Sequence, residues 1–299
     1  AEAALMQGRF ADAQIALESA YVQIEGNGQE NMALCCDFLA WRLSLCTDAA
    51  PRYSLEQRRA MLQRQHNAAW MNIWSAASAY YHALLGEPEK APDVFGGHRL
   101  STVNFLAPGR PMMDLIENQV YLAQGAYAKV ISRSEGLLAV CTGLHYALVA
   151  LHIRIQTAAA YAMLGKRGQA AALLGQAMDE AAPDGFVLPF AENYRCLRGL
   201  LEDGGEFPAR IVRLGEEYVS RCAERRAACP AAFAVLTGRE REIAALIAGR
   251  LSNREIAQKL YLSEGSVKQY VNRIYSKLLI EGDTRTKRRR LMELACGRP

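Results

Sequence analysis

Hydrophobic and polar residues follow each other with the period of an α-helix along this chain, most clearly in residues 236–280. Apolar side chains recur there every three or four positions, which predicts three short helices in succession. Thr237 and Glu240 have the spacing of a capping box, in which each side chain binds the other residue's backbone N–H, so the first helix begins there. Ser252 and Glu255 repeat this spacing and predict the start of the second helix.

The third predicted helix follows a tight turn and is capped by Ser263. Its apolar stripe consists of Val267, Val271, Ile274 and Leu278. A short helix needs one such stripe to dock on its neighbours, so its opposite face is free for a ligand. That face carries Gln269, Asn272, Arg273 and Ser276, with Lys268 at its edge. Two helices joined by a tight turn, the second bearing amides and cations, form the helix-turn-helix arrangement that enters the major groove of DNA.

This stretch resembles the C-terminal DNA-binding domain of LuxR-type bacterial transcription regulators. The resemblance extends over most of the chain from Leu236 onward and rests on Leu236-Thr237, Arg239-Glu240, Ser252-Asn253-x-Glu255-Ile256-Ala257, Ser263, Val267-Lys268, Ile274 and Lys277-Leu278. The chain departs from the family at Tyr270, where His is usual, and at Leu279, where Gly or Asn is usual. A chance helical bundle with ordinary caps is the alternative interpretation.

The resemblance implies a role for each polar residue around the third helix. The residues that match base-reading positions are Lys268, Gln269, Asn272 and Arg273. The residues expected to contact phosphates are Asn253, Arg254, Ser263, Ser266 and Arg285. The basic run 287–290 has two interpretations: it lies along the DNA backbone, or it is the solvated face of a fourth helix that buries Leu291, Leu294 and Ala295.

A second pattern repeats through the part of the chain that precedes this stretch. Glycines at 8, 86, 125, 165 and 205 each precede a run of small and apolar residues, and the intervals between the last four differ by no more than one position. Gly8 and Gly86 are separated by two such intervals, so a degenerate unit is expected near positions 45–48, with helices from Trp41 and the 53–62 stretch. A fixed period of this length indicates helix-turn-helix units stacked as a solenoid. The pattern resembles tetratricopeptide repeats, and a non-repeating bundle is the alternative.

A solenoid of this kind has a concave groove lined by the first helix of each unit. Counting back from each repeat glycine places six residues toward that groove, where they could bind an inducer or a partner protein. These residues are Tyr80, Gln119, His152, Glu192, Arg195 and Glu202.

The expected fold is therefore all-α: a tetratricopeptide-like helical-repeat solenoid followed by a small four-helix LuxR-type helix-turn-helix domain. The predicted domains are a sensor and oligomerisation domain at 1–224, a linker at 225–235 and a DNA-binding domain at 236–299. This order resembles the C-terminal portion of the ATP-dependent regulators of the maltose-activator type. In that family a nucleotide-switch module precedes the repeats, so ATP is expected only if such a module exists; the start at Ala1, inside a repeat, suggests a fragment or a shortened version.

The distribution of charge indicates the class of binding partner, and the cysteine pattern indicates the cellular compartment. Residues 237–299 carry 14 Lys and Arg against 7 Asp and Glu, a net charge of +7, whereas the remainder has a net charge of −3. A basic domain on a slightly acidic body fits double-stranded DNA as the partner of one end only. The eight cysteines show no CxxC pair, which favours a reducing, cytoplasmic location. No apolar run is long enough to span a membrane.

The sequence contains no Walker motif, dinucleotide-binding GxGxxG motif or nucleophile elbow, and its five histidines form no recognisable metal site. We therefore expect no catalytic residues, no metal and no cofactor in this chain. The function expected is a bacterial transcription regulator, with self-association on DNA and RNA polymerase as a further partner. The alternative interpretation is an interaction scaffold whose C-terminal domain is an adaptor. An enzyme is the third interpretation. An adaptor needs apolar anchors on the third helix, where this chain has Gln269, Asn272 and Arg273.

Overall fold

The computed structural model describes residues 1–27, 29, 32–65, 68–103, 109–201, 205–227, 233 and 235–295. Every regular element in these residues is a helix, which confirms the all-α prediction. The chain divides into two compact units, unit 1 at Ala1–Cys222 and unit 2 at Ala223–Pro299. In the described residues no helix has the length and apolar content needed to cross a bilayer.

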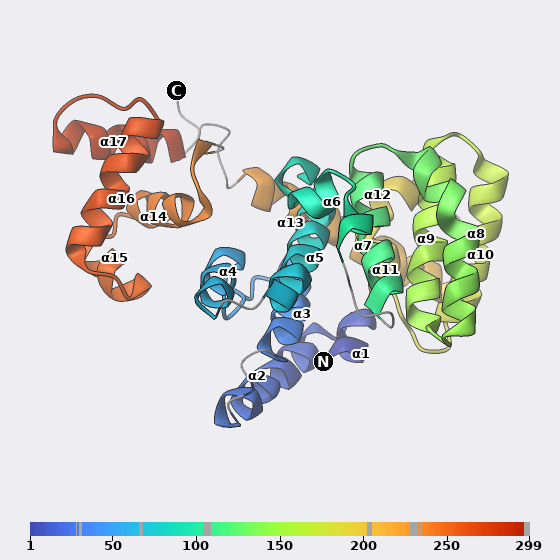
Figure 1. Cartoon of the computed structure of the whole chain (residues 1–299). Coiled ribbons are helices and arrows are strands. Elements are labelled where there is room, and N and C mark those ends of the chain that lie inside the picture. The colour runs from blue at the N-terminus through green and yellow to red at the C-terminus, as the bar shows by residue number, and fades with distance from the viewer. Residues whose placement is uncertain are drawn as a thin grey trace. The chain divides into compact units, whose positions relative to one another are not determined.

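The helices of unit 1 are drawn from blue to orange in Figure 1. They are α1 (Glu2–Met6), α2 (Phe10–Gly26), α3 (Ala33–Cys46), α4 (Leu55–Arg64), α5 (Ala68–Leu85), η2 (Pro88–Lys90), α6 (Asp93–Gly96), η3 (Leu100–Thr102), α7 (Arg110–Ala123), α8 (Tyr127–Gly143), α9 (Ala147–Met163), α10 (Arg167–Ala181), α11 (Leu188–Glu192), α12 (Tyr194–Leu197) and η5 (Arg198–Leu200). Helix α13 (Glu206–Ala227) belongs mostly to unit 1 and continues into the first residues of the predicted linker.

Four of the five repeat glycines end a helix in the left-handed conformation. Gly8, Gly86, Gly125 and Gly165 have φ between 73° and 81°, which glycine adopts at little cost because it has no Cβ. At Gly125 the N–H of the glycine binds Leu122 O at 3.1 Å and the next N–H binds Tyr121 O at 2.8 Å. This pair of hydrogen bonds closes a helix, and the same pair occurs at the other three glycines. Each of these four glycines therefore ends one helix and lets the chain turn toward the next helical segment.

Two expectations about the repeat have different outcomes. Two helices, α3 and α4, lie where the degenerate unit was expected, and the indole N–H of Trp41 on α3 donates to Tyr53 O, just before α4, at 2.8 Å. The fifth glycine, Gly205, stands directly before α13 and has no left-handed φ. The residues on its N-terminal side, 202–204, lie outside the described part of the chain.

Unit 1 does not extend as an open solenoid, because its first helix, α1, contacts α11 and shares a core with α13. The N–H of Val187, just before α11, donates to Met6 O at the end of α1 at 2.9 Å, and α1 lies beside α11 in Figure 1. Gln7 donates from its side-chain amide to Asp184 O at 2.8 Å. One apolar core accordingly combines Leu5 of α1 with Tyr218 and Cys222 of α13. This closure fills the space where the sequence predicted an open groove.

Unit 2 contains the three predicted helices and the fourth one. These are α14 (Gly238–Ala248), α15 (Asn253–Leu260), α16 (Glu264–Lys277) and α17 (Thr284–Ala295). Their core includes Ile243, Ile256, Val267 and Leu291, each with no exposed surface. Phe233 is also buried in this core although the sequence assigned it to the linker. Residues 228–232 of the predicted linker, Pro230 among them, lie outside the described residues.

Candidate nucleic-acid interface

Both predicted capping boxes are present at the starts of α14 and α15. Thr237 N–H donates to Glu240 Oε2 at 2.7 Å, and Glu240 N–H donates back to Thr237 Oγ1 at 3.4 Å. Ser252 and Glu255 make the equivalent pair at 2.7 and 3.3 Å. These bonds satisfy backbone donors that the first turn of a helix leaves free, which fixes where each helix begins.

Glu240 has a second role that its capping motif did not reveal. Its buried carboxylate accepts a hydrogen bond from Lys277 Nζ at 2.7 Å, which ties the start of α14 to the end of α16. Burial opposes ionisation of Glu240, but the hydrogen bonds from Lys277 and Thr237 outweigh it and hold the pKa of this carboxyl below its usual range. Arg239 holds the turn before α16 by donating to Leu260 O at 3.1 Å. Helix α16 is thus fixed at both ends.

Helix α16 buries the predicted stripe and exposes the predicted polar face. Val267, Val271 and Ile274 are buried, and Leu278 is partly buried against the same core. The four predicted base-reading residues, and Ser276 beside them, are all exposed: Lys268, Gln269, Asn272 and Arg273. The guanidinium of Arg273 lies 5.6 Å from the ring centre of Tyr270, which keeps it along the helix surface. Amides and cations therefore share one solvent-facing side of a rigidly held helix.

The residues predicted to contact phosphates lie around this face, but they differ in whether their side chains already have hydrogen-bond partners within unit 2. Arg254 and Arg285 are exposed, and neither has a side-chain partner among the described residues. Ser263 Oγ accepts from Ser266 N–H at 3.0 Å and therefore caps α16. Asn253 Oδ1 accepts from Arg288 at 3.2 Å, so its amide already has a structural partner.

In the basic run 287–290 of α17, Arg289 and Arg290 are exposed, Lys287 and Arg288 are half-buried, and all four make contacts within unit 2. Arg288 donates to Leu251 O, and Arg290 donates to Glu281 O at 3.2 Å. Arg289 lies 3.6 Å from Glu293, and Lys287 lies 6.0 Å from the ring centre of Tyr275. These contacts support the second interpretation of this run, the solvated face of a helix whose Leu291 is buried.

Sequence reasoning missed that, in the described part of unit 2, three helix ends use left-handed residues other than glycine. These are Arg250, Tyr261 and Leu279, with φ of 66°, 54° and 52°. Each makes the same hydrogen-bond pattern as the repeat glycines of unit 1; for Leu279, its N–H binds Ser276 O and the next N–H binds Tyr275 O. The departure from the family at Leu279 is therefore a left-handed position occupied by a branched side chain. No glycine marks these helix ends, so the sequence offered no local signal for their left-handed conformation.

The six predicted groove residues do not line an open groove. Tyr80, Gln119, His152 and Glu192 are buried, Arg195 is exposed, and Glu202 lies outside the described residues. Tyr80 and Glu192 bond to each other in the interior and Gln119 bonds to a neighbouring side chain, whereas His152 Nδ1 has no hydrogen-bond partner among the described residues.

Glu192 lies at the centre of this buried polar cluster. Its carboxylate accepts from Arg42 Nε at 2.8 Å and from Tyr80 OH at 2.8 Å. Burial and the positive charge of Arg42 lower the pKa of His152 to about 3. Gln119 donates to Asn193 Oδ1 at 3.2 Å and accepts from Gln156 at 2.8 Å.

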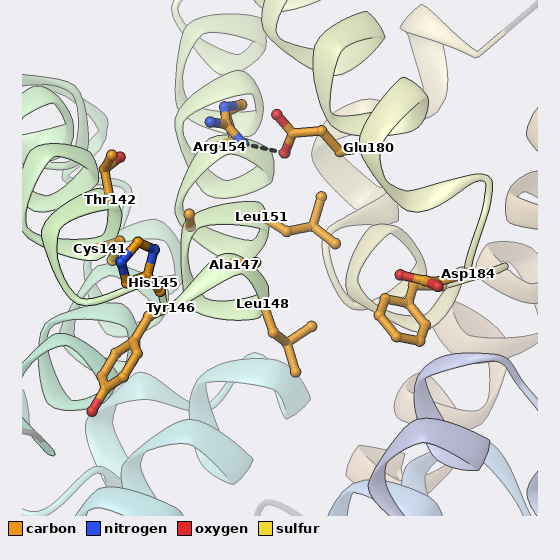
Figure 2. Close-up of a pocket in the computed structure, with 12 residues that line it drawn as sticks. Cys141, Thr142, His145, Tyr146, Ala147, Leu148, Leu151, Arg154, Glu180 and Asp184 are labelled. Carbon is orange, nitrogen blue, oxygen red and sulfur yellow. Dashed lines mark hydrogen bonds and ion pairs between the residues drawn. The ribbon is translucent and has the colours of Figure 1, made fainter.

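A separate pocket of about 490 Å³ opens between α8, the start of α9 and the end of α10. Leu148, Leu151 and Phe186 contribute apolar surface to it, and Arg154 forms an ion pair with Glu180 beside them (Figure 2). The pocket combines an apolar surface with charged groups, as small-molecule sites do. No sequence motif indicated it, because its lining comes from three helices and two turns.

Comparison with known proteins assigns unit 2 but not unit 1. Residues 234–287 match the family described as "Bacterial regulatory proteins, luxR family". The chain is also similar to the transcriptional regulatory protein LnrK of Bacillus subtilis (strain 168), at 49% identity over 49 residues. That match covers 16% of this chain and 22% of the relative. No solved structure matches the chain. Unit 2 therefore contains a luxR-family domain, as the sequence predicted.

Proposed function

We propose that this chain is a bacterial transcription regulator that binds double-stranded DNA through unit 2 and is controlled through unit 1. The observation that carries the proposal is the exposed polar and basic face of α16 within a luxR-family match. Helix α16 enters the major groove, Gln269 and Asn272 pair with adenine, and Lys268 and Arg273 contact guanine or phosphate. Arg254, Ser263, Ser266 and Arg285 contact the backbone on either side.

The direct test is site selection by the whole chain from a random duplex pool, followed by titration of the selected duplex at several salt concentrations. Each neutralised phosphate contributes about 0.9 to the slope of log K against log salt, so several contacts give a steep decline in affinity. A selected consensus together with that decline supports the proposal. Failure to enrich any sequence, or an affinity that does not change with salt, contradicts it.

The length of α16 supports self-association on the DNA. A helix of 14 residues is about 21 Å long, and only its exposed side meets bases, so one copy reads a short half-site. Two copies on adjacent half-sites supply the remaining specificity, and RNA polymerase is the further partner expected of a regulator. A selected site with two related halves, bound by two copies, supports this part; a single half-site bound by one copy contradicts it.

The sensing role of unit 1 is part of the proposal, with the α8–α10 pocket as the place where an inducer binds. The test is a thermal-shift screen of metabolites on the whole chain, repeated with Ala147→Trp, which fills the pocket from an exposed position. We expect a stabilising compound whose effect is lost in the variant. A compound that stabilises both proteins equally binds elsewhere and contradicts this assignment.

A further inference from the structure

The turn between α15 and α16 contains a side chain that the fold does not require. Tyr261 has φ 54° and ψ 44°, a conformation that disfavours every residue with a Cβ. Its side chain is also 97% exposed, so it contributes no packing to the core of unit 2. Glycine would satisfy this position at less cost, which makes the presence of a tyrosine the feature to be explained.

The backbone of this turn is fixed without help from the tyrosine side chain. Leu262 N–H donates to Ala257 O at 2.9 Å, and Tyr261 N–H makes a longer bond to Gln258 O at 3.4 Å. The carbonyl just before the turn, Leu260 O, accepts from Arg239. Leu262 packs against the core on the far side of the turn. The tyrosine side chain is therefore held in solvent by a turn that forms around it.

The surroundings of Tyr261 favour DNA over a protein partner. The exposed residues next to it in sequence are polar or charged: Gln258, Lys259, Ser263 and Glu264. A single aromatic ring among such residues is not an apolar docking patch. The tyrosine stands two residues before Ser263, the cap of the helix that carries the proposed base readers. Tyrosine hydroxyls are among the groups that bind DNA phosphates and so set the position of a protein on the duplex.

We propose that Tyr261 is a positioning residue whose hydroxyl donates a hydrogen bond to a DNA phosphate beside the groove that α16 enters. This inference rests on the proposed function. The contact is independent of base sequence, because every nucleotide presents the same phosphate oxygens. It also leaves the salt dependence unchanged, because a neutral hydroxyl does not displace a counterion as Lys and Arg do.

The test compares three variants of the whole chain: Tyr261→Phe, Tyr261→Gly and the matched control Leu279→Gly. Leu279 is also left-handed and 86% exposed, but it lies at the opposite end of α16. Fluorescence anisotropy measures affinity for a duplex selected by the wild-type protein and for a duplex of unrelated sequence. We expect both Tyr261 variants to bind both duplexes about five- to tenfold more weakly, with unchanged salt slope. Leu279→Gly binds like the wild type.

Thermal denaturation separates this role from a structural one. Both glycine variants remove the same backbone strain, so both should melt at a higher temperature than the wild type, whereas Tyr261→Phe should melt at the same temperature. A variant that is more stable and yet binds DNA more weakly identifies a contact with DNA. Unfolding or a lower melting temperature in Tyr261→Gly would instead mean that the side chain supports the fold, and the inference would be wrong.

The remaining outcomes also decide between the two proposals. If the wild-type chain binds neither duplex, the proposed function fails and the inference fails with it. If the wild type binds and Tyr261→Phe binds equally well, the hydroxyl contact alone is wrong. Unchanged DNA affinity with reduced transcription by purified RNA polymerase would assign Tyr261 to a protein partner and overturn the inference.

Discussion

Arg42 on α3 and Glu192 on α11, far apart in sequence, form a buried, two-bonded ion pair. Arg42 Nε lies 2.8 Å from Glu192 Oε1, and Nη2 lies 3.1 Å from Oε2. Their side chains are 5% and 1% exposed. The guanidinium also lies 5.5 Å from the ring centre of Tyr80, whose hydroxyl donates to the same carboxylate. This pair links early and late helices of unit 1 and closes it.

We expect Glu192→Gln to destabilise unit 1 by about 3–5 kcal/mol, because it leaves the charge of Arg42 buried without a counterion. The measurement is the free energy of unfolding from urea denaturation followed by circular dichroism. The double variant Arg42→Met with Glu192→Met is the control, since replacing both charges by apolar groups removes the unpaired charge. The double variant should be more stable than the single one; a loss below about 1 kcal/mol in Glu192→Gln would show that the pair is unimportant.

His152 gives unit 1 a predictable dependence on pH. Its pKa in the folded protein is about 3, against 6.5 as the ordinary value, so only the unfolded chain takes up this proton as the pH falls from 6.5 toward 3. The contribution of neutral His152 to the free energy of unfolding is therefore fully present above pH 6.5 and is lost as the pH decreases below that value. At pH 5 the loss is about 2 kcal/mol.

The variant that tests this is His152→Leu, in which the buried group cannot titrate. Its unfolding free energy should fall less between pH 7 and pH 5 than that of the wild type, by about 2 kcal/mol. His145→Gln, a substitution of an exposed histidine, is the control for the replacement of a histidine side chain as such. Parallel pH curves for His152→Leu and the wild type would contradict the assignment.

Replacement of glycine by alanine should change the melting temperature in opposite directions at Gly215 and at Gly175. A Cβ on Gly215 of α13 would lie 2.3 Å from Tyr194 Cγ, whereas one on Gly175 of α10 would meet nothing within 4 Å. Gly215→Ala should therefore lower the melting temperature through overpacking, at about 1–3 kcal/mol or more. Gly175→Ala should raise it, since alanine is better than glycine inside a helix by up to about 1 kcal/mol. Equal shifts in both variants would mean that Tyr194 of α12 does not lie against Gly215 of α13.

Unit 2 was predicted well because its signals are local. The pairs Thr237 with Glu240 and Ser252 with Glu255 are each separated by less than one helical turn, and the apolar stripe of α16 repeats within one helix. Residues separated by such short spacings are also neighbours on a folded helix, so the sequence pattern alone predicts their contacts. The family match over residues 234–287 agrees with the domain they indicated.

The closure of unit 1 could not be predicted by the same means. The repeat glycines marked individual turns, but the contact between Arg42 and Glu192 depends on the accumulated curvature of all the helices between them. Spacing alone placed Glu192 and Tyr80 on an inner face and could not show that both side chains are buried. The left-handed Tyr261 was missed for a different reason: glycine is the usual signal for such a turn, and here it is absent.

One pair of substitutions can distinguish residues of unit 2 that contact DNA bases from residues that contact DNA phosphates. Asn272 is exposed on α16, and its amide can pair bidentately with adenine, at about 1–3 kcal/mol of discrimination. Arg285 is exposed in the first turn of α17 and has no side-chain partner among the described residues, so it is free to reach a phosphate. Asn272→Ala should therefore flatten base preference at one position of the selected site, and Arg285→Ala should weaken all sequences alike and reduce the salt slope by about one. Site selection followed by titration at several salt concentrations measures both. If Asn272→Ala weakens binding uniformly and leaves the selected site unchanged, α16 does not read bases through this residue.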